Sequence, residues 1–137
     1  MADLVRREGL EDEIVLDSAG TGAWHMGSPP DERASATATA RGLTLGGVAR
    51  RVELSDFDEF DLILAMDRSN LGDLRALAPS EQARTKVHLL REFDPEASGD
   101  LDVPDPYYGG PGGFEHVFDL VTAACEGLLA EIRAGSL

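Results

Sequence analysis

The segment Asp105-Pro106-Tyr107-Tyr108-Gly109 holds the residue types that most clearly suggest chemistry in this sequence. It places a carboxylic acid next to a proline, whose fixed φ helps to hold a turn, and next to two aromatic rings. A carboxyl group in such a turn suits a general acid, which gives a proton to a leaving group. A general acid works together with a nucleophile or a water molecule, and the only cysteine of the chain is Cys125.

Cys125 belongs to a pattern that predicts a structural role. It is one of the apolar residues that recur on one face of a predicted helix over 113–134, namely Phe114, Val117, Phe118, Val121, Ala124, Cys125, Leu128 and Ile132. A buried thiol in apolar surroundings has a raised pKa and is a weak nucleophile. We therefore expect Cys125 to be a core residue. A single cysteine also excludes an internal disulfide and a multi-cysteine metal site.

Composition limits the function classes further. The net charge of −14, from 12 basic and 26 acidic residues, argues against nucleic-acid binding. No apolar run has the length of a membrane span, and no signal-peptide pattern opens the chain, so we expect no membrane partner. One cysteine fits a reducing, cytoplasmic location.

We expect no cofactor and no metal. His25, His88 and His116 lack the spacing of metal ligands. A calcium site at 100–105 is also disfavoured, because Asp100, Asp102 and Asp105 lack the glycine and the distal glutamate of an EF-hand loop.

The elements that must position Asp105 alternate between helix and strand. The sequence predicts helices over 2–8, 31–41, from 69 or 70 to 77, and 113–134, and strands over 13–17, 61–66 and 86–90. This order predicts a single α/β domain with a parallel sheet flanked by helices. The loops that follow the carboxyl ends of the strands, 18–24, 67–70 and 91–113, should converge on one rim, where ligands of such sheets bind.

In this order and spacing, several motifs together identify a family. The chain resembles the low-molecular-weight protein tyrosine phosphatases of the bacterial kind. The resemblance rests on Asp17-Ser18-Ala19-Gly20-Thr21, Trp24-His25-Met26-Gly27, Pro29-Pro30-Asp31-Glu32-Arg33-Ala34, Phe60-Asp61-Leu62-Ile63-Leu64-Ala65-Met66-Asp67, Ser69-Asn70-Leu71 and Asp105-Pro106-Tyr107-Tyr108-Gly109.

The resemblance implies roles for individual residues. Asp105 matches the general acid that protonates the leaving phenolate and later activates water. Trp24, Tyr107 and Tyr108 match aromatic residues that stack on a phosphotyrosine ring. The implied substrate is a phosphotyrosine protein or a small aryl phosphate.

Two further residues have two readings each. Ser18 resembles a hydroxyl that makes a hydrogen bond to the phosphate-binding loop without touching the phosphate, and it could equally cap a turn. Asp67 could orient groups of the loops, and it could equally be the carboxylate at a helix start.

The chain departs from the family in its nucleophile. The family begins with a central strand and a loop with the pattern Cys-x5-Arg, whose thiolate attacks phosphorus, and this pattern does not occur here. We therefore expect 1–137 to be an N-terminally truncated domain that lacks a strand between 13–17 and 61–66. Those two strands should either pair with each other or promote self-association through exposed sheet edges.

Three functions follow as hypotheses. The first is a protein tyrosine phosphatase that is inactive in this form because the nucleophile loop is absent. The second is a non-catalytic remnant that acts as an interaction module. The third, an arsenate reductase, requires further redox cysteines and is disfavoured.

Overall fold

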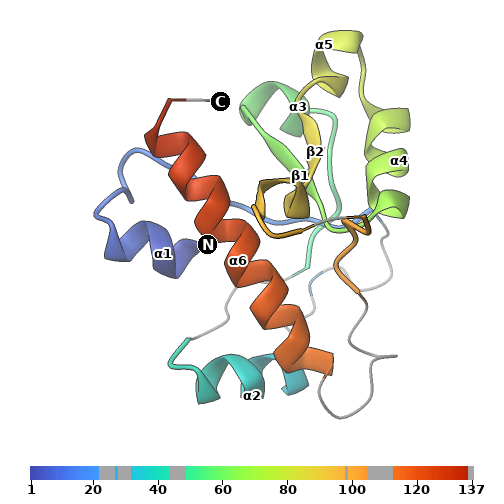
Figure 1. Ribbon diagram of the computed structural model, residues 1–137. Coiled ribbons are helices and arrows are strands. Elements are labelled where there is room, and N and C mark those ends of the chain that lie inside the picture. The colour runs from blue at the N-terminus through green and yellow to red at the C-terminus, as the bar shows by residue number, and fades with distance from the viewer. Residues whose placement is uncertain (22–26, 28–31, 44–48, 98, 105–112, 136–137) are drawn as a thin grey trace.

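The computed structural model describes residues 1–21, 27, 32–43, 49–97, 99–104 and 113–135 (Figure 1). Within these residues the chain forms α1 (Ala2–Arg7), α2 (Glu32–Ala40), α3 (Asp56–Glu59), β1 (Ile63–Ala65), α4 (Arg68–Leu77), α5 (Glu81–Arg84), β2 (Val87–Leu89), the 3-10 helix η1 (Leu90–Phe93) and α6 (Gly113–Arg133).

The sheet of the described part consists of β1 and β2, which are parallel, with Leu64 opposite His88. Side chains of β1 alternate between two hydrophobic clusters. Ile63 and Ala65 belong to the first cluster, whose buried members are Phe57, Ala65, Leu74, Ala78, Ala83, Val87 and Leu89. Leu62 and Leu64 pack on the second cluster, whose buried members are Leu90, Ala124, Cys125 and Leu128.

Helices therefore cover both faces of the sheet. Figure 1 shows α6 on one side of β1 and β2 and α4 on the other. Parallel strands with both faces covered have near-continuous apolar sequences, which explains the run at 61–66. The predicted α/β class, with a parallel sheet flanked by helices, is confirmed.

Local signals set the ends of the helices. Asp67 caps α4 by accepting a hydrogen bond of 2.7 Å from the Asn70 N–H. At the other end of α4, Ala78 precedes Pro79, which cannot continue a helix. α1 is followed by Gly9 at a φ of +69°, a conformation that favours glycine after a helix.

The predicted strand at 13–17 is wrong. These residues form no strand, and β1 pairs only with β2 among the described residues. Pairing of 13–17 with 61–66, one of the two predicted alternatives, therefore does not occur, and self-association through exposed sheet edges stays a prediction. Val15 is 79% exposed and Leu16 is 43% exposed. An apolar segment becomes a strand only where a neighbouring strand supplies hydrogen bonds, and no strand in the described part of the chain does so for 13–17. A single bridge from Gly20 to Arg51 is the nearest pairing.

Candidate functional site

The carboxyl end of β1 holds the segment that leads to Asp105. The Val103 N–H donates a hydrogen bond of 2.7 Å to the Met66 carbonyl. The Arg68 N–H, at the start of α4, donates one of 2.9 Å to a carboxylate oxygen of Asp102. Two consecutive residues, 102 and 103, are thus attached to the junction between β1 and α4.

A side chain from η1 holds the same segment from the other side. Arg91 Nη1 donates hydrogen bonds to the carbonyls of Asp100, at 2.9 Å, and Asp102, at 2.8 Å. Leu101 between them packs against the first core cluster. The chain at 100–103 is therefore fixed by four hydrogen bonds and one apolar contact.

Asp67 lies at this rim as the N-cap of α4, directly before Arg68. Its Oδ1 atom is occupied by the Asn70 N–H. The structure thus places Asp67 in the helix-start position that the sequence offered as one of two readings. It also puts Asp67 in the same junction that holds 102–103.

Ser18 lies in a second group of polar residues. Its N–H donates a hydrogen bond of 2.8 Å to the Asp17 carboxylate. Arg50 contacts Asp17 at 3.2 Å and binds Asp56 through two hydrogen bonds of 3.0 Å each. The Glu53 N–H donates a further bond of 2.8 Å to Asp56.

Asp56 is the charged centre of this group, because it is only 6% exposed. Its hydrogen bonds from Arg50, and then the bond from the Glu53 N–H, hold the pKa of the Asp56 carboxyl below its usual value, against the effect of burial. The same bonds raise the pKa of Arg50. Both groups are therefore charged at neutral pH, and the pair fixes the segment before Gly20 to α3.

The predicted convergence of three loops is only partly visible in the described residues. The second and third loops are joined directly by the bonds of Asp102 and Val103. The first loop reaches the same core indirectly: Gly20 accepts a 2.9 Å hydrogen bond from Val52, which packs on the first core cluster.

The remaining predicted site residues lie outside the described residues. These are the proposed general acid Asp105 and the three aromatic residues Trp24, Tyr107 and Tyr108. The structure brings Asp67 to the rim and Ser18 to the Asp17–Arg50 group.

Cys125 is confirmed as a core residue. It lies in α6, is 5% exposed and belongs to the second core cluster. Burial raises the pKa of its thiol above the ordinary value. At neutral pH the sulfur is therefore protonated and shielded, which is the opposite of what a nucleophile requires.

Three contributors to the polar contacts at the candidate site were not predicted from the sequence: Arg91, Asp102 and the Arg50–Asp56 pair. Arg91 and Asp102 lie in or beside a segment without periodicity. Asp56 is six residues from Arg50, a spacing that corresponds to no local motif. The one available signal was the acid-rich start of a short segment, Ser55-Asp56-Phe57-Asp58-Glu59, which is typical of a helix N-terminus.

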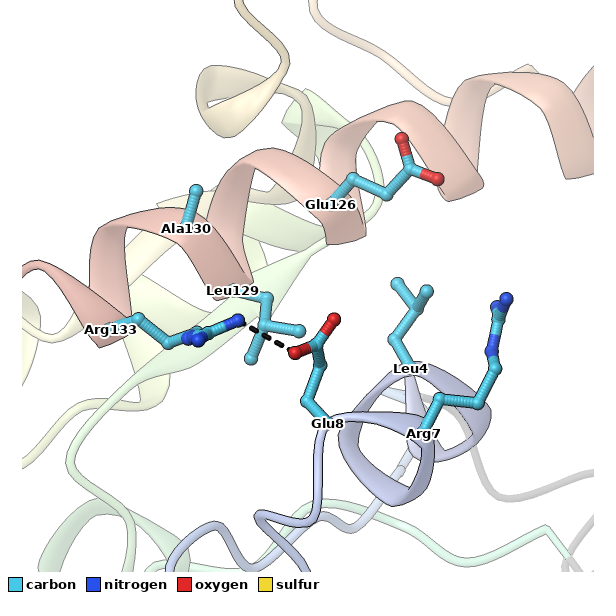
Figure 2. A pocket seen from close by; sticks show the side chains of 7 residues that line it. All are labelled: Leu4, Arg7, Glu8, Glu126, Leu129, Ala130 and Arg133. Carbon is cyan, nitrogen blue, oxygen red and sulfur yellow. Dashed lines mark hydrogen bonds and ion pairs between the residues drawn. The ribbon is translucent and has the colours of Figure 1, made fainter.

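A separate surface hollow lies between α1 and α6 and has a volume of about 400 Å³ (Figure 2). It is lined by Leu4, Arg7, Glu8, Glu126, Leu129, Ala130 and Arg133. The Arg133 guanidinium spans it to Glu8 at 2.7 Å. None of these residues belongs to the three loops, so the hollow lies outside the candidate site.

The described residues also bear on two other kinds of site. No group of three or more His, Cys, Asp or Glu side chains is arranged to hold a metal ion there. In the same part of the chain, every helix is too short or too polar to cross a membrane.

Comparison with known proteins connects these features to a family. A family model described as "Low molecular weight phosphotyrosine protein phosphatase" matches residues 1–136. A low-molecular-weight protein-tyrosine-phosphatase of Streptomyces coelicolor is 48% identical over 139 residues, covering 97% of this chain and 85% of that protein. The Bacillus subtilis protein YfkJ, which has the same description, is 44% identical and covers 96% of this chain and 82% of its own length.

The chain is also similar in fold to solved structures of proteins from this family. A protein tyrosine phosphatase from Entamoeba histolytica, with Hepes in its active site, superposes with a TM-score of 0.92 at 36% identity, covering 98% of this chain and 85% of the other. The crystal structure of YfkJ superposes with a TM-score of 0.88 at 41% identity, covering 98% and 83%.

Proposed function

Because the chain belongs to the low-molecular-weight phosphotyrosine protein phosphatase family, we propose that it carries the acid half of a phosphomonoester-hydrolysing site, with Asp105 as the general acid. The substrate class is a phosphotyrosine protein or a small aryl phosphate. The location is the cytoplasm, where a protein with one free cysteine is at no risk of oxidative pairing.

The observation that carries this proposal is the attachment of residues 100–103 to the sheet. A general acid must be held within hydrogen-bond reach of the leaving oxygen, and misplacement by about 1 Å lowers rates sharply. The bonds of Asp102 and Val103 to the β1–α4 junction supply a fixed base two residues before Asp105. The rigid φ of Pro104 and Pro106 on either side supports the same role.

The aromatic and polar residues have supporting roles in this proposal. Trp24, Tyr107 and Tyr108 would stack on the aryl ring of the substrate. Ser18 and Asp67 would orient backbone and side-chain groups at the mouth of the site. The placement of Asp67 beside the anchor of 102–103 supports its role.

We further propose that these 137 residues by themselves hydrolyse phosphomonoesters poorly. The family chemistry uses a cysteine thiolate, and the sole cysteine is buried with a raised pKa. Loss of a covalent nucleophile typically lowers turnover by several orders of magnitude. We expect the rate with p-nitrophenyl phosphate to be at least about 10³-fold below that of a complete relative.

The test measures hydrolysis of p-nitrophenyl phosphate by the purified chain, by Cys125→Ser and by Asp105→Asn, beside B. subtilis YfkJ. Absence of turnover in all three forms agrees with the proposal. Turnover that is lost in Cys125→Ser would make the buried thiol a nucleophile and overturn it. Turnover that survives in Cys125→Ser and is lost in Asp105→Asn would require a mechanism without cysteine.

The buried thiol also favours a second function, a non-catalytic module that binds phosphorylated aromatic groups. Trp24 is the only tryptophan, so its fluorescence reports on the ligand side of the proposed site. Saturable quenching by phenyl phosphate, absent with phenol and absent in Trp24→Phe, would support binding without turnover. Equal responses to phenol and phenyl phosphate would exclude recognition of the phosphate.

A further inference from the structure

The segment 21–26 is attached at both ends to one short stretch of the chain, residues 49–52. Three hydrogen bonds between backbone groups make this attachment: the Gly20 N–H to the Arg50 carbonyl at 2.8 Å, the Val52 N–H to the Gly20 carbonyl at 2.9 Å, and the Gly27 N–H to the Ala49 carbonyl at 2.7 Å. Gly20 precedes the segment and Gly27 follows it, so both of its ends lie beside the same stretch. A short segment whose two ends are held together is frequently functional.

The side chain of Arg50 fixes this stretch to two other parts of the chain. Its guanidinium reaches the half-exposed Asp17 at 3.2 Å and makes two hydrogen bonds of 3.0 Å to the buried Asp56 of α3. It donates a further bond of 3.2 Å to the neighbouring Arg51 carbonyl. A guanidinium can serve these acceptors at once because its five donors lie in a fixed fork, whereas an ammonium is a single point. Arg50 therefore joins the start of 21–26, which its carbonyl binds, to the two carboxylates.

The main partner of Arg50 is itself fixed to the interior. Asp56 is only 6% exposed. Phe57, which follows Asp56 in α3, is 1% exposed and belongs to the first hydrophobic cluster, on which Val52 also packs. A fully hydrogen-bonded polar group in such surroundings is rigid. The stretch 49–52 therefore forms a base that cannot shift without breaking buried contacts.

We propose that Arg50 is a positioning residue for Trp24, because it fixes the stretch to which both ends of 21–26 are bonded. This role rests on the proposed function, in which Trp24 stacks on the aryl ring of a substrate. A ring that is already in place loses little freedom on binding, so its stacking contributes more to affinity. An alkyl phosphate has no ring to stack. Arg50 therefore favours aryl phosphates over alkyl phosphates without touching either.

Trp24 is the only tryptophan, so its time-resolved fluorescence anisotropy measures the motion of 21–26 in the full 137-residue chain. Arg50→Lys keeps a positive charge beside Asp56 but has one nitrogen in place of the fork, so the chain should stay folded by circular dichroism. We expect the amplitude of the nanosecond depolarisation of Trp24 to rise at least about twofold. Gly127→Ala is the matched control, since it disturbs the packing of α6 on η1 in another part of the fold, and it should leave this amplitude unchanged. An unchanged amplitude in Arg50→Lys, or an equal rise in both variants, would overturn the proposal.

Gly27→Ala tests the other end of 21–26 in a chain that keeps Arg50. Gly27 has a φ of +81°, which disfavours residues with a Cβ atom, and a Cβ atom there would meet nothing within 4 Å. The strain should weaken the bond of Gly27 to Ala49 and raise the same amplitude at least about twofold. An unchanged amplitude in this variant would show that the bonded ends do not hold Trp24, and would also overturn the proposal.

Isothermal titration calorimetry separates this role from the proposed function. Arg50→Lys should weaken the binding of phenyl phosphate about three- to tenfold and change that of methyl phosphate by less than about twofold. Equal losses for the two ligands would overturn the preference for aryl groups. If phenyl phosphate does not bind the unmodified chain, the proposed function of the site fails, and the anisotropy measurements still decide whether Arg50 positions Trp24.

Discussion

Gly127 is the position where one methyl group should reverse the usual effect of a glycine-to-alanine change. In an exposed helix interior, alanine is favoured over glycine by about 1 kcal/mol. At Gly127 in α6, however, a Cβ atom would lie 1.8 Å from the Phe93 carbonyl oxygen and 2.9 Å from its carbon. Real carbon atoms do not approach that closely, so α6 and η1 must separate by more than about 1 Å.

The magnitude follows from two opposed contributions. Insertion of a methyl group into a tightly packed contact costs about 1–3 kcal/mol, and more where the backbone itself must move. The obstacle here is backbone, so we take the upper end of this range and subtract the helix preference of about 1 kcal/mol. Gly127→Ala should then lower the free energy of unfolding by about 2 kcal/mol or more.

Gly72 supplies the matched control. It also lies inside a helix, α4, but a Cβ atom there meets nothing within 4 Å. Gly72→Ala should therefore raise the free energy of unfolding by about 0.5–1 kcal/mol. The same chemical change thus has opposite signs at two helical positions of one chain.

Urea denaturation followed by circular dichroism at 222 nm measures both effects. Thermal denaturation followed at the same wavelength should show midpoint temperature shifts of about 3–5 °C per kcal/mol for a domain of this size, downward for Gly127→Ala and upward for Gly72→Ala. A Gly127→Ala variant as stable as the unmodified chain would refute the close approach of α6 to Phe93. A loss of stability in Gly72→Ala would refute the helix argument.

Four other substitutions test the polar contacts, and one labelling experiment tests the burial of Cys125. Asp56→Ala leaves Arg50 without its buried partner and should cost about 2–4 kcal/mol in urea denaturation, whereas Asp17→Ala removes a half-exposed pair and should cost under about 1 kcal/mol. Because folding lowers the pKa of Asp56, its carboxylate stabilises the fold at neutral pH, and this stabilisation is lost as the pH falls from about 4 through the lower pKa of the folded state. The loss of unfolding free energy caused by Asp56→Ala should therefore become smaller in that pH range. Cys125 should react with a thiol reagent at least about a hundredfold more slowly in the native chain than in urea, and equal rates would contradict its burial. Asp102→Ala should lower the free energy of unfolding by about 1 kcal/mol. Asp102→Asn should recover most of this loss, because an amide oxygen also accepts the hydrogen bond from the Arg68 N–H at the start of α4. Equal losses in the two variants would exclude that hydrogen bond as the cause.

The sequence was sufficient where a pattern is long or strongly one-sided. The apolar face of α6 extends along a helix of 21 residues, so this helix was predicted from its periodicity. The strand at 61–66 was predicted from its nearly continuous apolar run, which is typical of a strand covered on both faces. The short helices α3 and α5 have four residues each, which is too short for a helical period to be recognised.

The error at 13–17 has a different origin. Ile14-Val15-Leu16 has the composition of a strand, but a strand is a property of two segments and not of one. The sequence shows the preference of a segment for extended structure, and it does not show whether a partner is available. The same limit applies to Asp56, whose burial and pairing with Arg50 depend on the packing of α3 and not on any spacing.

The candidate site illustrates why residue types and positions were predictable to different degrees. Asp105 could be proposed as the general acid from the sequence because acid chemistry requires a carboxyl group, and few residue types supply one. The hydrogen bonds that hold the preceding segment, 100–103, were not predictable in this way, because most of their atoms belong to the backbone. They use the carbonyls of Met66, Asp100 and Asp102 and the N–H groups of Arg68 and Val103. Backbone groups are present at every residue, so this part of the site leaves almost no trace in the sequence. Among the groups that hold 100–103, only the side chains of Arg91 and Asp102 are specific to their residue types. Substitutions at these two positions should therefore displace the segment that leads to Asp105 without changing the carboxyl group of Asp105 itself.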